Sequence, residues 1–324
     1  MSAVSVVLIG RNEGARLTAA LAALDGHAGA AVYVDSGSLD DSIARARAAG
    51  LRVVALDDSA PHSAARGRNA GFEALEAAGE TGAFVQFIDG DCALVPGWLE
   101  AGAAALAADP GLGLVTGWRA EIAPSASVYN GLCDSEWHRP AGPIATCGGD
   151  MMVRAEAFRA IGGFDPTVIA AEDDEFCLRL GTAGWRLRRL PLPMTRHDAA
   201  MTRFSQWWRR AERSGHGFAQ VGAMHPPHFT AERRRVWLFA VILPLLLLAG
   251  LLSGQAWLGW LVVAAYLLSY LRGVAGLYRQ GVSGGAALQQ GLLLSLSKFP
   301  NLLGMARYHL RRARGRRMRL IEYK

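Results

Sequence analysis

Lysine is almost absent from this chain of 324 residues: the only two are Lys298 and Lys324, so arginine carries most of the net charge of +6. No lysine before Lys298 is available for catalysis. A Walker A loop grips phosphate with a Gly-Lys-Ser/Thr sequence, and the chain has none. That class of nucleotide-binding protein is therefore excluded.

Cysteine is also scarce. The four cysteines, Cys92, Cys133, Cys147 and Cys177, form no Cys-x-x-Cys pair of the kind that zinc ribbons and redox centres use. We therefore expect reduced thiols that pack in the protein interior.

Charge is low and unevenly spread. Charged residues make up 19% of the chain against 51% hydrophobic residues, and charge almost disappears from Val236 until Arg307. This shift predicts a globular domain over residues 1–200 and an amphipathic coupling segment over 201–235. A transmembrane helical hairpin is expected over 236–271, followed over 272–324 by an interfacial or re-entrant helix and a basic cytoplasmic tail.

The first half of the chain alternates strand-like and helix-like sequence. Its opening run, VSVVLI, is too short for a signal peptide and follows no basic segment, so we expect a first strand there. AVYVD, LRVVAL and AFVQFID follow, with helix-like stretches between them. The alternation predicts an α/β, Rossmann-like fold with a mostly parallel sheet, whose ligands bind beyond the carboxyl ends of the strands.

Acidic residues stand at two of these strand ends. Asp35 ends the second run, Asp89 ends the fourth, and Asp91 follows after Gly90. Each alone is typical of a helix cap or a turn, but together they indicate a site. Because close carboxylates repel each other unless a positive group intervenes, we expect Mg²⁺ or Mn²⁺ there, sharing its ligands with substrate phosphates.

Five motifs in order across residues 4–200 resemble a family 2 glycosyltransferase of the GT-A fold. They are VVLIGRNE, VDSGSLDDS, ARGRNAGFEA, the DGD of a DxD motif, and GGDMMVRAEAFRAIGGFD followed by EDDEFCLRLGTAGWRL. The shared order is more specific than any single motif. The resemblance implies a GT-A catalytic domain followed by an α-helical membrane region. It also implies a metal-dependent transfer that inverts the configuration at the anomeric carbon of the sugar.

The resemblance also implies roles for individual residues. Asp35 would contact the nucleobase of a uridine-diphosphate sugar, Asp89 would face the ribose and the metal, and Asp91 would ligate the metal. Asp173 would be the base that takes a proton from the acceptor hydroxyl. The other residues implied are Asn12, Glu13, Arg66, Asn69 and Arg209 for the nucleotide sugar and His197 for the metal.

Elementary chemistry supports parts of this arrangement. Arg66 and Arg68 have the fork geometry that suits phosphate, and an incoming hydroxyl needs a carboxylate base on the far side of the sugar ring. For Asp174 and Glu175 we expect only a solvated acidic first turn, favoured by the helix dipole.

The segment FSQWWRRAERSGHGFAQ differs from the Gln-x-x-Arg-Trp motif of processive relatives. Gln206 and Arg209 match it, but Arg210 stands where those relatives have tryptophan. The difference favours transfer of a single sugar. A helix lying on the membrane with its aromatic side chains at headgroup level is an equally good interpretation.

The apolar end predicts attachment to the inner (cytoplasmic) membrane. Residues 236–253 and 256–271 are read as two crossings, and the arginines that flank them place the catalytic domain on the cytoplasmic side. A third crossing over 286–310 would export the basic tail, so we prefer an interfacial or re-entrant helix. Beside a membrane, anionic lipid is a better partner for that tail than nucleic acid.

These observations favour transfer of one sugar from a UDP-sugar to a polyprenyl-linked acceptor, in exopolysaccharide or related glycan assembly. A non-catalytic nucleotide-sugar-binding scaffold or sensor of a membrane glycan synthase complex is the alternative. A phosphatase of the haloacid dehalogenase type is discounted, because Ala93 replaces its threonine or valine and no downstream lysine is suitable.

Overall fold

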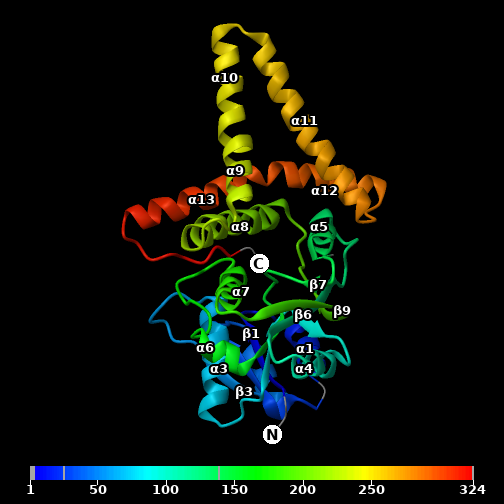
Figure 1. The fold of residues 1–324 in the computed structure, drawn as a ribbon, viewed down its shortest axis with the longest axis vertical. Helices are drawn as coiled ribbons and strands as arrows, with labels where there is room; N and C mark the ends of the chain where they lie inside the picture. Colours follow the sequence, from blue (N-terminus) through cyan, green and yellow to red (C-terminus); the bar gives the residue numbers. More distant parts are fainter. Residues whose placement is uncertain (1–3, 25, 138, 323–324) are drawn as a thin grey trace. The chain divides into compact units, whose positions relative to one another are not determined.

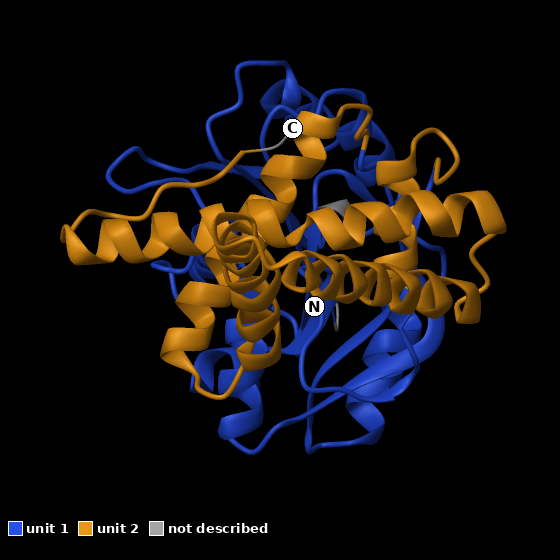
Figure 2. Ribbon diagram, turned by 90° about the horizontal axis from the view of Figure 1, so that it is seen from above, with its two compact units in different colours: residues 1–122, 137–199 blue, residues 123–136, 200–324 orange. Residues whose placement is uncertain are grey.

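The chain folds into two compact units (Figures 1 and 2). The computed structural model describes residues 4–24, 26–137 and 139–322. One unit holds residues 1–122 and 137–199, and the other holds 123–136 and 200–324. The chain therefore leaves the first unit after Ile122, returns at Trp137 and leaves it again after Ala199.

A single mixed sheet forms the centre of the first unit. Within the described residues its strands are β1 (Val4–Gly10), β2 (Ala31–Asp35), β3 (Arg52–Ala55), β4 (Phe84–Asp89), β5 (Cys92–Leu94), β6 (Leu112–Glu121), β7 (Gly142–Pro143), β8 (Met151–Arg154) and β9 (Arg186–His197). They lie in the order β3-β2-β1-β4-β8-β6-β9-β5, and β7 pairs with β9. The strands β3, β2, β1 and β4 are parallel, as the sequence alternation predicts, whereas β8 is antiparallel to both of its neighbours.

Helices cover both faces of this sheet. They are α1 (Ala15–Ala22), α2 (Ser42–Ala48), α3 (Ala64–Ala77), α4 (Trp98–Ala108), α6 (Ala155–Ala160) and α7 (Glu172–Thr182). Successive side chains of β1 point to opposite faces, as in any strand. Val6 and Leu8 join the core with α1 and α4, whereas Val7 and Ile9 join the core with α3, α6 and α7. The predicted α/β layering is therefore confirmed.

The second unit has helices and no strand among its described residues. Its helices are α5 (Val128–Trp137, all but its last residue), α8 (Phe204–Met224), α9 (Thr230–Trp237), α10 (Leu243–Ser253), α11 (Ala256–Arg279), α12 (Gly284–Leu296) and α13 (Lys298–Ala313), and one π-helical segment, Leu238–Ile242, joins α9 to α10. The helix α8 packs along α13, where Gly215 and Gly304 let the two backbones approach closely.

One aromatic side chain of α8 lies in this unit's core. Trp207 is buried in a cluster with Leu132 of α5 and Leu293 of α12. It cannot serve as the headgroup-level anchor that one interpretation of the sequence gives it, because its ring surface is already covered by protein. Phe204, by contrast, is exposed.

Two helical segments are long and apolar enough to cross a bilayer, by length and composition: Thr230–Ser253 and Ala256–Arg279, each of 24 residues. The second continues past residue 271, where the apolar sequence pattern ends. Large side chains on both are exposed, among them Leu252 and Trp260 at 81% and 74%. Exposed apolar side chains of this kind are unfavourable in water, and we predict that these helices lie in a membrane.

We expect the contact between α3 and β1 to tolerate no side chain at Gly71. A Cβ there would overlap Val7, so Gly71→Ala should destabilise the protein by about 1–3 kcal/mol through overpacking. Thermal unfolding in detergent, followed by circular dichroism, measures this.

Gly181→Ala is the matched control. It is also a helical glycine, but a Cβ at Gly181 would meet nothing within 4 Å, so this change should stabilise by about 0.5–1 kcal/mol. Equal unfolding temperatures for the two variants would contradict the packing described here.

Candidate active site

The strand register brings the acidic strand ends to one edge of the sheet. Asp35 lies beside Gly10, and Asp89 lies beside Ile9, so the ends of β2 and β4 flank the end of β1. The loop that follows β1 carries Asn12 and is tied to the β2 loop, since Leu39 donates its backbone N–H to Asn12 Oδ1 at 2.7 Å. Side chains from three loops therefore share this edge.

Gly90 allows the turn between Asp89 and Asp91 to lie against β1. Its N–H donates to the carbonyl of Ile9 at 2.7 Å. A Cβ at Gly90 would come within 2.9 Å of Glu13 Cγ and 3.1 Å of the Ile9 carbonyl oxygen. The glycine is thus needed for close backbone approach.

Two arginines balance the charge of Asp89. The Arg68 guanidinium donates to Asp89 Oδ1 at 2.8 Å, and Arg119 lies 3.5 Å from Asp89 Oδ2. Arg68 is buried and also donates to Glu172 at 2.9 Å, so it links α3, β4 and α7. The sequence analysis expects Arg68 to bind phosphate, but in the structure its guanidinium binds Asp89 and Glu172.

Asp150 organises the other side of Asp89. It is buried and accepts hydrogen bonds from the Asp89 backbone N–H at 3.1 Å and the Thr195 hydroxyl at 2.8 Å. It also forms an ion pair with Arg119 at 2.6 Å. The Arg119 guanidinium in turn lies over the ring of Trp137, 5.1 Å from its centroid.

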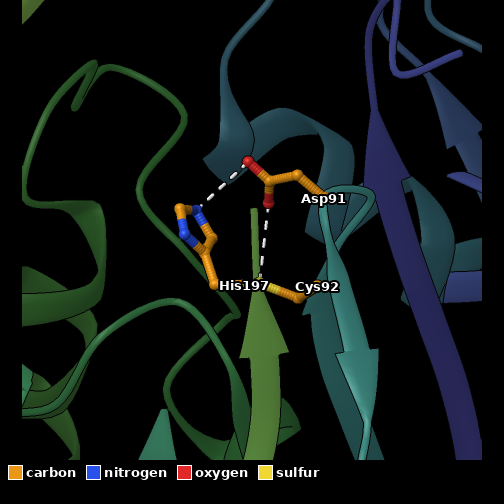
Figure 3. Close-up of side chains that lie close together, drawn as sticks. All are labelled: Asp91, Cys92 and His197. Atoms are coloured by element: carbon orange, nitrogen blue, oxygen red, sulfur yellow. Dashed lines mark hydrogen bonds and ion pairs between the residues drawn. The ribbon is translucent and has the colours of Figure 1, made fainter. Parts of the chain in front are cut away.

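Asp91 has a different partner, His197 at the end of β9 (Figure 3). Asp91 Oδ2 lies 3.3 Å from His197 Nε2, and the other ring nitrogen, Nδ1, lies 3.0 Å from Glu121 Oε2. Burial lowers the pKa of His197 below its ordinary value, although the bond to Glu121 acts in the opposite direction. The structure therefore places a predicted metal carboxylate and a predicted metal histidine together.

The pair fits a divalent cation chemically. A carboxylate oxygen suits Mg²⁺ or Mn²⁺, and a neutral imidazole nitrogen is the commonest metal ligand in proteins. Cys92 lies close to both, but burial raises the pKa of its thiol well above the ordinary value, and a protonated thiol does not ligate these ions. Asp89 suits a cation less well than Asp91 does, because two guanidiniums already face it.

The first turn of α7 carries Asp173. The side chain is half-buried, and burial, with repulsion from Glu172 and Asp174, raises its pKa well above the ordinary value while Arg68 acts to lower it. The expectation that Glu175 is solvated is wrong. Glu175 is buried and accepts two bonds from Arg179, at 2.7 and 2.8 Å, because the guanidinium replaces the water it has lost.

Several residues predicted to bind the nucleotide sugar hold loops in place. Asp35 is buried and accepts the backbone N–H groups of Gly37 and Ser38, at 2.9 and 2.8 Å. Arg66 donates to backbone carbonyls of the loop before α3. Asn69 both donates to and accepts from the backbone of Phe164. Their direct contact with a nucleotide stays a prediction.

Arg209 belongs to the second unit, where it is exposed on α8. The neighbouring Arg210 forms an ion pair with Glu136 of α5 at 2.8 Å, within the same unit. Gln206 accepts backbone N–H groups at the start of α8, at 3.0 Å from Thr202 and 3.0 Å from Arg203.

Sequence reasoning missed four charged residues of this edge: Arg119, Glu121, Asp150 and Glu172. Asp150 and Glu172 lie inside motifs that carry the family resemblance, so their position was a usable signal. Arg119 and Glu121 had no such signal, because they only end the strand-like run LGLVTGWRAE.

Solved structures with the same architecture identify the fold. The mannosyltransferase PcManGT of Pyrobaculum calidifontis superimposes with a TM-score of 0.54 at 20% identity, covering 96% of this chain and 86% of that one. TarS 1–349 of S. aureus does so with a TM-score of 0.51 at 14% identity, covering 97% and 92%. The fold is that of the GT-A glycosyltransferases.

The family follows from the sequence itself. The model described as glycosyl transferase family group 2 matches residues 84–278, more than half of the chain, so the protein belongs to this family. It is 30% identical over 211 residues to the pre-mycofactocin glycosyltransferase of Mycobacterium tuberculosis, a match that covers 55% of this chain. The match spans 43% of that relative, less than half its length.

Arg68 should be essential to the stability of the site. Arg68→Leu leaves the buried Glu172 carboxylate without its guanidinium, which should cost about 3–5 kcal/mol. Loss of thermal stability in detergent measures the effect.

Arg52→Leu provides the comparison, because the Arg52–Glu80 pair is solvent-exposed and should contribute less than about 1 kcal/mol. If both variants unfolded at the wild-type temperature, the Arg68 pair would not be the buried link described above.

Proposed function

We propose that this glycosyltransferase moves one sugar, with inversion, from a UDP-sugar to a membrane acceptor carried on a polyprenyl lipid, in exopolysaccharide or related glycan assembly. The catalytic part of this proposal rests on one observation. Asp89, Asp91 and His197 lie at one edge of the sheet, and Arg68 joins Asp89 to the first turn of α7. The identity of donor and acceptor goes beyond the family assignment and is the part to be tested.

In this proposal Asp91 and His197 hold Mg²⁺ or Mn²⁺. Such a cation supplies Lewis-acid charge to the diphosphate as it leaves the sugar. The fold relatives PcManGT and GalNAc-T7 have been solved with Mn²⁺, the first together with GDP-Man and the second with UDP and GalNAc. Those complexes support a nucleotide-sugar donor here, and we favour the uridine nucleotide on the resemblance of the VDSGSLDDS segment.

Asp173 is the proposed base for the acceptor hydroxyl. It lies at the start of α7, next in sequence to Glu172, whose carboxylate is held by Arg68. A carboxyl group with a raised pKa is a better proton acceptor than an ordinary aspartate once it is ionised. Burial and acidic neighbours supply that increase here.

The exposed apolar helices support a lipid-borne acceptor. Thr230–Ser253 and Ala256–Arg279 would anchor the enzyme in the inner membrane, with the catalytic unit in the cytoplasm. The arginines from Arg311 to Arg319 are exposed or half-buried and would bind anionic lipid. A polyprenyl-linked acceptor lies in the same membrane, so transfer needs no soluble carrier.

A panel of labelled nucleotide sugars tests the proposal. The full chain in nanodiscs is incubated with bacterial lipid extract and each UDP- or GDP-linked sugar, with Mn²⁺ or with a chelator. We expect label in the lipid-soluble fraction from a UDP-sugar, and loss of that label with the chelator. A water-soluble product would contradict the acceptor, and activity only with GDP-sugars would contradict the donor.

Binding of UDP without any product would instead favour the sensor or scaffold. Isothermal titration with UDP, with and without Mn²⁺, separates that outcome from a protein that binds no nucleotide. The retained acidic groups Asp91 and Asp173 favour the enzyme over the sensor.

Asp173→Asn should retain UDP binding and lower the transfer rate by about 10²–10⁴-fold, because the amide cannot accept the proton. Asp174→Asn is the matched control, with the same change one residue away and a rate near wild type. In the wild type, kcat/KM should fall as the pH drops through the pKa of Asp173, which lies above that of an ordinary aspartate. Full activity of Asp173→Asn would remove it from catalysis.

A further inference from the structure

Glu121 is a buried carboxylate to which neither the sequence motifs nor the family resemblance gives a role. It is the last residue of β6, and its side chain has 0% exposure. In the parallel pairing of β6 with β9 it lies directly beside His197. A carboxylate in such a place needs hydrogen-bond donors on both oxygens.

Ala199 and His197 are hydrogen-bond partners of this carboxylate. The backbone N–H of Ala199 lies 3.2 Å from Oε1 and 3.1 Å from Oε2 of Glu121. His197 Nδ1 lies 3.0 Å from Oε2. Both ring nitrogens face carboxylates, which only accept, so the shorter contact decides the tautomer. Nδ1 lies 3.0 Å from Glu121 and Nε2 lies 3.3 Å from Asp91, so we assign the hydrogen of the neutral imidazole to Nδ1, which donates it to Glu121.

That assignment fixes the other ring nitrogen. With its hydrogen on Nδ1, the imidazole presents an unprotonated Nε2 to Asp91 Oδ2 at 3.3 Å. Two acceptors at this distance repel each other unless a positive group lies between or beside them. Figure 3 shows the two side chains facing each other, and a cation bound by both would remove this repulsion.

A third contact restricts rotation of the ring. Trp137 packs edge-on against the imidazole, with centroids 4.6 Å apart and planes at 80°. With Glu121 at Nδ1 and Trp137 against the ring, His197 lies with Nε2 toward Asp91.

We propose that Glu121 is a positioning residue for the metal: it holds His197 in the tautomer and orientation that direct Nε2 to the cation shared with Asp91. The inference rests on the metal-dependent transfer proposed above. Carboxylate partners of this kind raise the basicity of a histidine ligand, and their loss costs about 10–100-fold in metal affinity.

Manganese binding to the full chain tests this without any turnover. Free Mn²⁺ is titrated by electron paramagnetic resonance in the presence of UDP, and pulsed measurements detect ¹⁴N coupling from a directly bound imidazole. The wild type should show that coupling, and His197→Ala should abolish it. Glu121→Gln, which keeps the size of the side chain, should weaken Mn²⁺ binding by about 10–100-fold and reduce the coupling.

Two further variants make the result specific. Glu100→Gln makes the same change at an exposed position on α4 and should bind Mn²⁺ as the wild type does. Glu121→Asp keeps the charge but withdraws the carboxylate from Nδ1, so it should also weaken binding, by about tenfold. This second variant serves if Glu121→Gln does not fold, as judged by circular dichroism.

The outcomes separate the inference from the proposal beneath it. If the wild type binds Mn²⁺ with ¹⁴N coupling and the folded Glu121 variants match it within twofold, Glu121 has only a structural role and the inference is overturned. If the wild type binds Mn²⁺ without ¹⁴N coupling, His197 is not a ligand and the inference also fails. If the wild type binds no Mn²⁺ with UDP, the metal dependence of the proposed function fails first.

Discussion

The buried guanidinium of Arg68 is the interaction on which this site depends. It reaches from α3 to Asp89 at the end of β4 and to Glu172 at the start of α7. Gly149 makes the space for it, because a Cβ there would overlap the guanidinium. Removing this arginine leaves the buried Glu172 carboxylate without the guanidinium that balances its charge. The relative placement of the DxD turn and the proposed base follows from this one side chain.

Charge compensation also explains why Asp89 and Asp91 can stand so close. Asp89 faces two arginines, while Asp91 faces a histidine that is held from behind by Glu121. The two carboxylates therefore have different charged partners. This division makes Asp91 the better candidate for a cation and gives Asp89 a position fixed by protein groups alone.

The path of the chain gives His197 a further distinction. Glu121 and Trp137, which both contact its ring, lie at either end of the excursion over residues 123–136 that belongs to the helical unit. Glu121 and Trp137 therefore lie at the two ends of the segment that contains α5. Within the helical unit, α5 packs against α8 and α12, and Ser135 donates to Gln290 at 2.9 Å.

The sequence alone determined the α/β layering, the family, the acidic strand ends and the two apolar helices. Periodicity, motif order and composition can be read along the chain without knowing which distant residues are in contact. It could not determine that Glu175 is buried, that Trp207 is core, or that Asp35 and Asn69 hold loops. It also gave no sign of Glu121 or Arg119. Their importance arises from pairing between β6 and β9, strands far apart in sequence, and from burial that turns ordinary charges into obligatory partners.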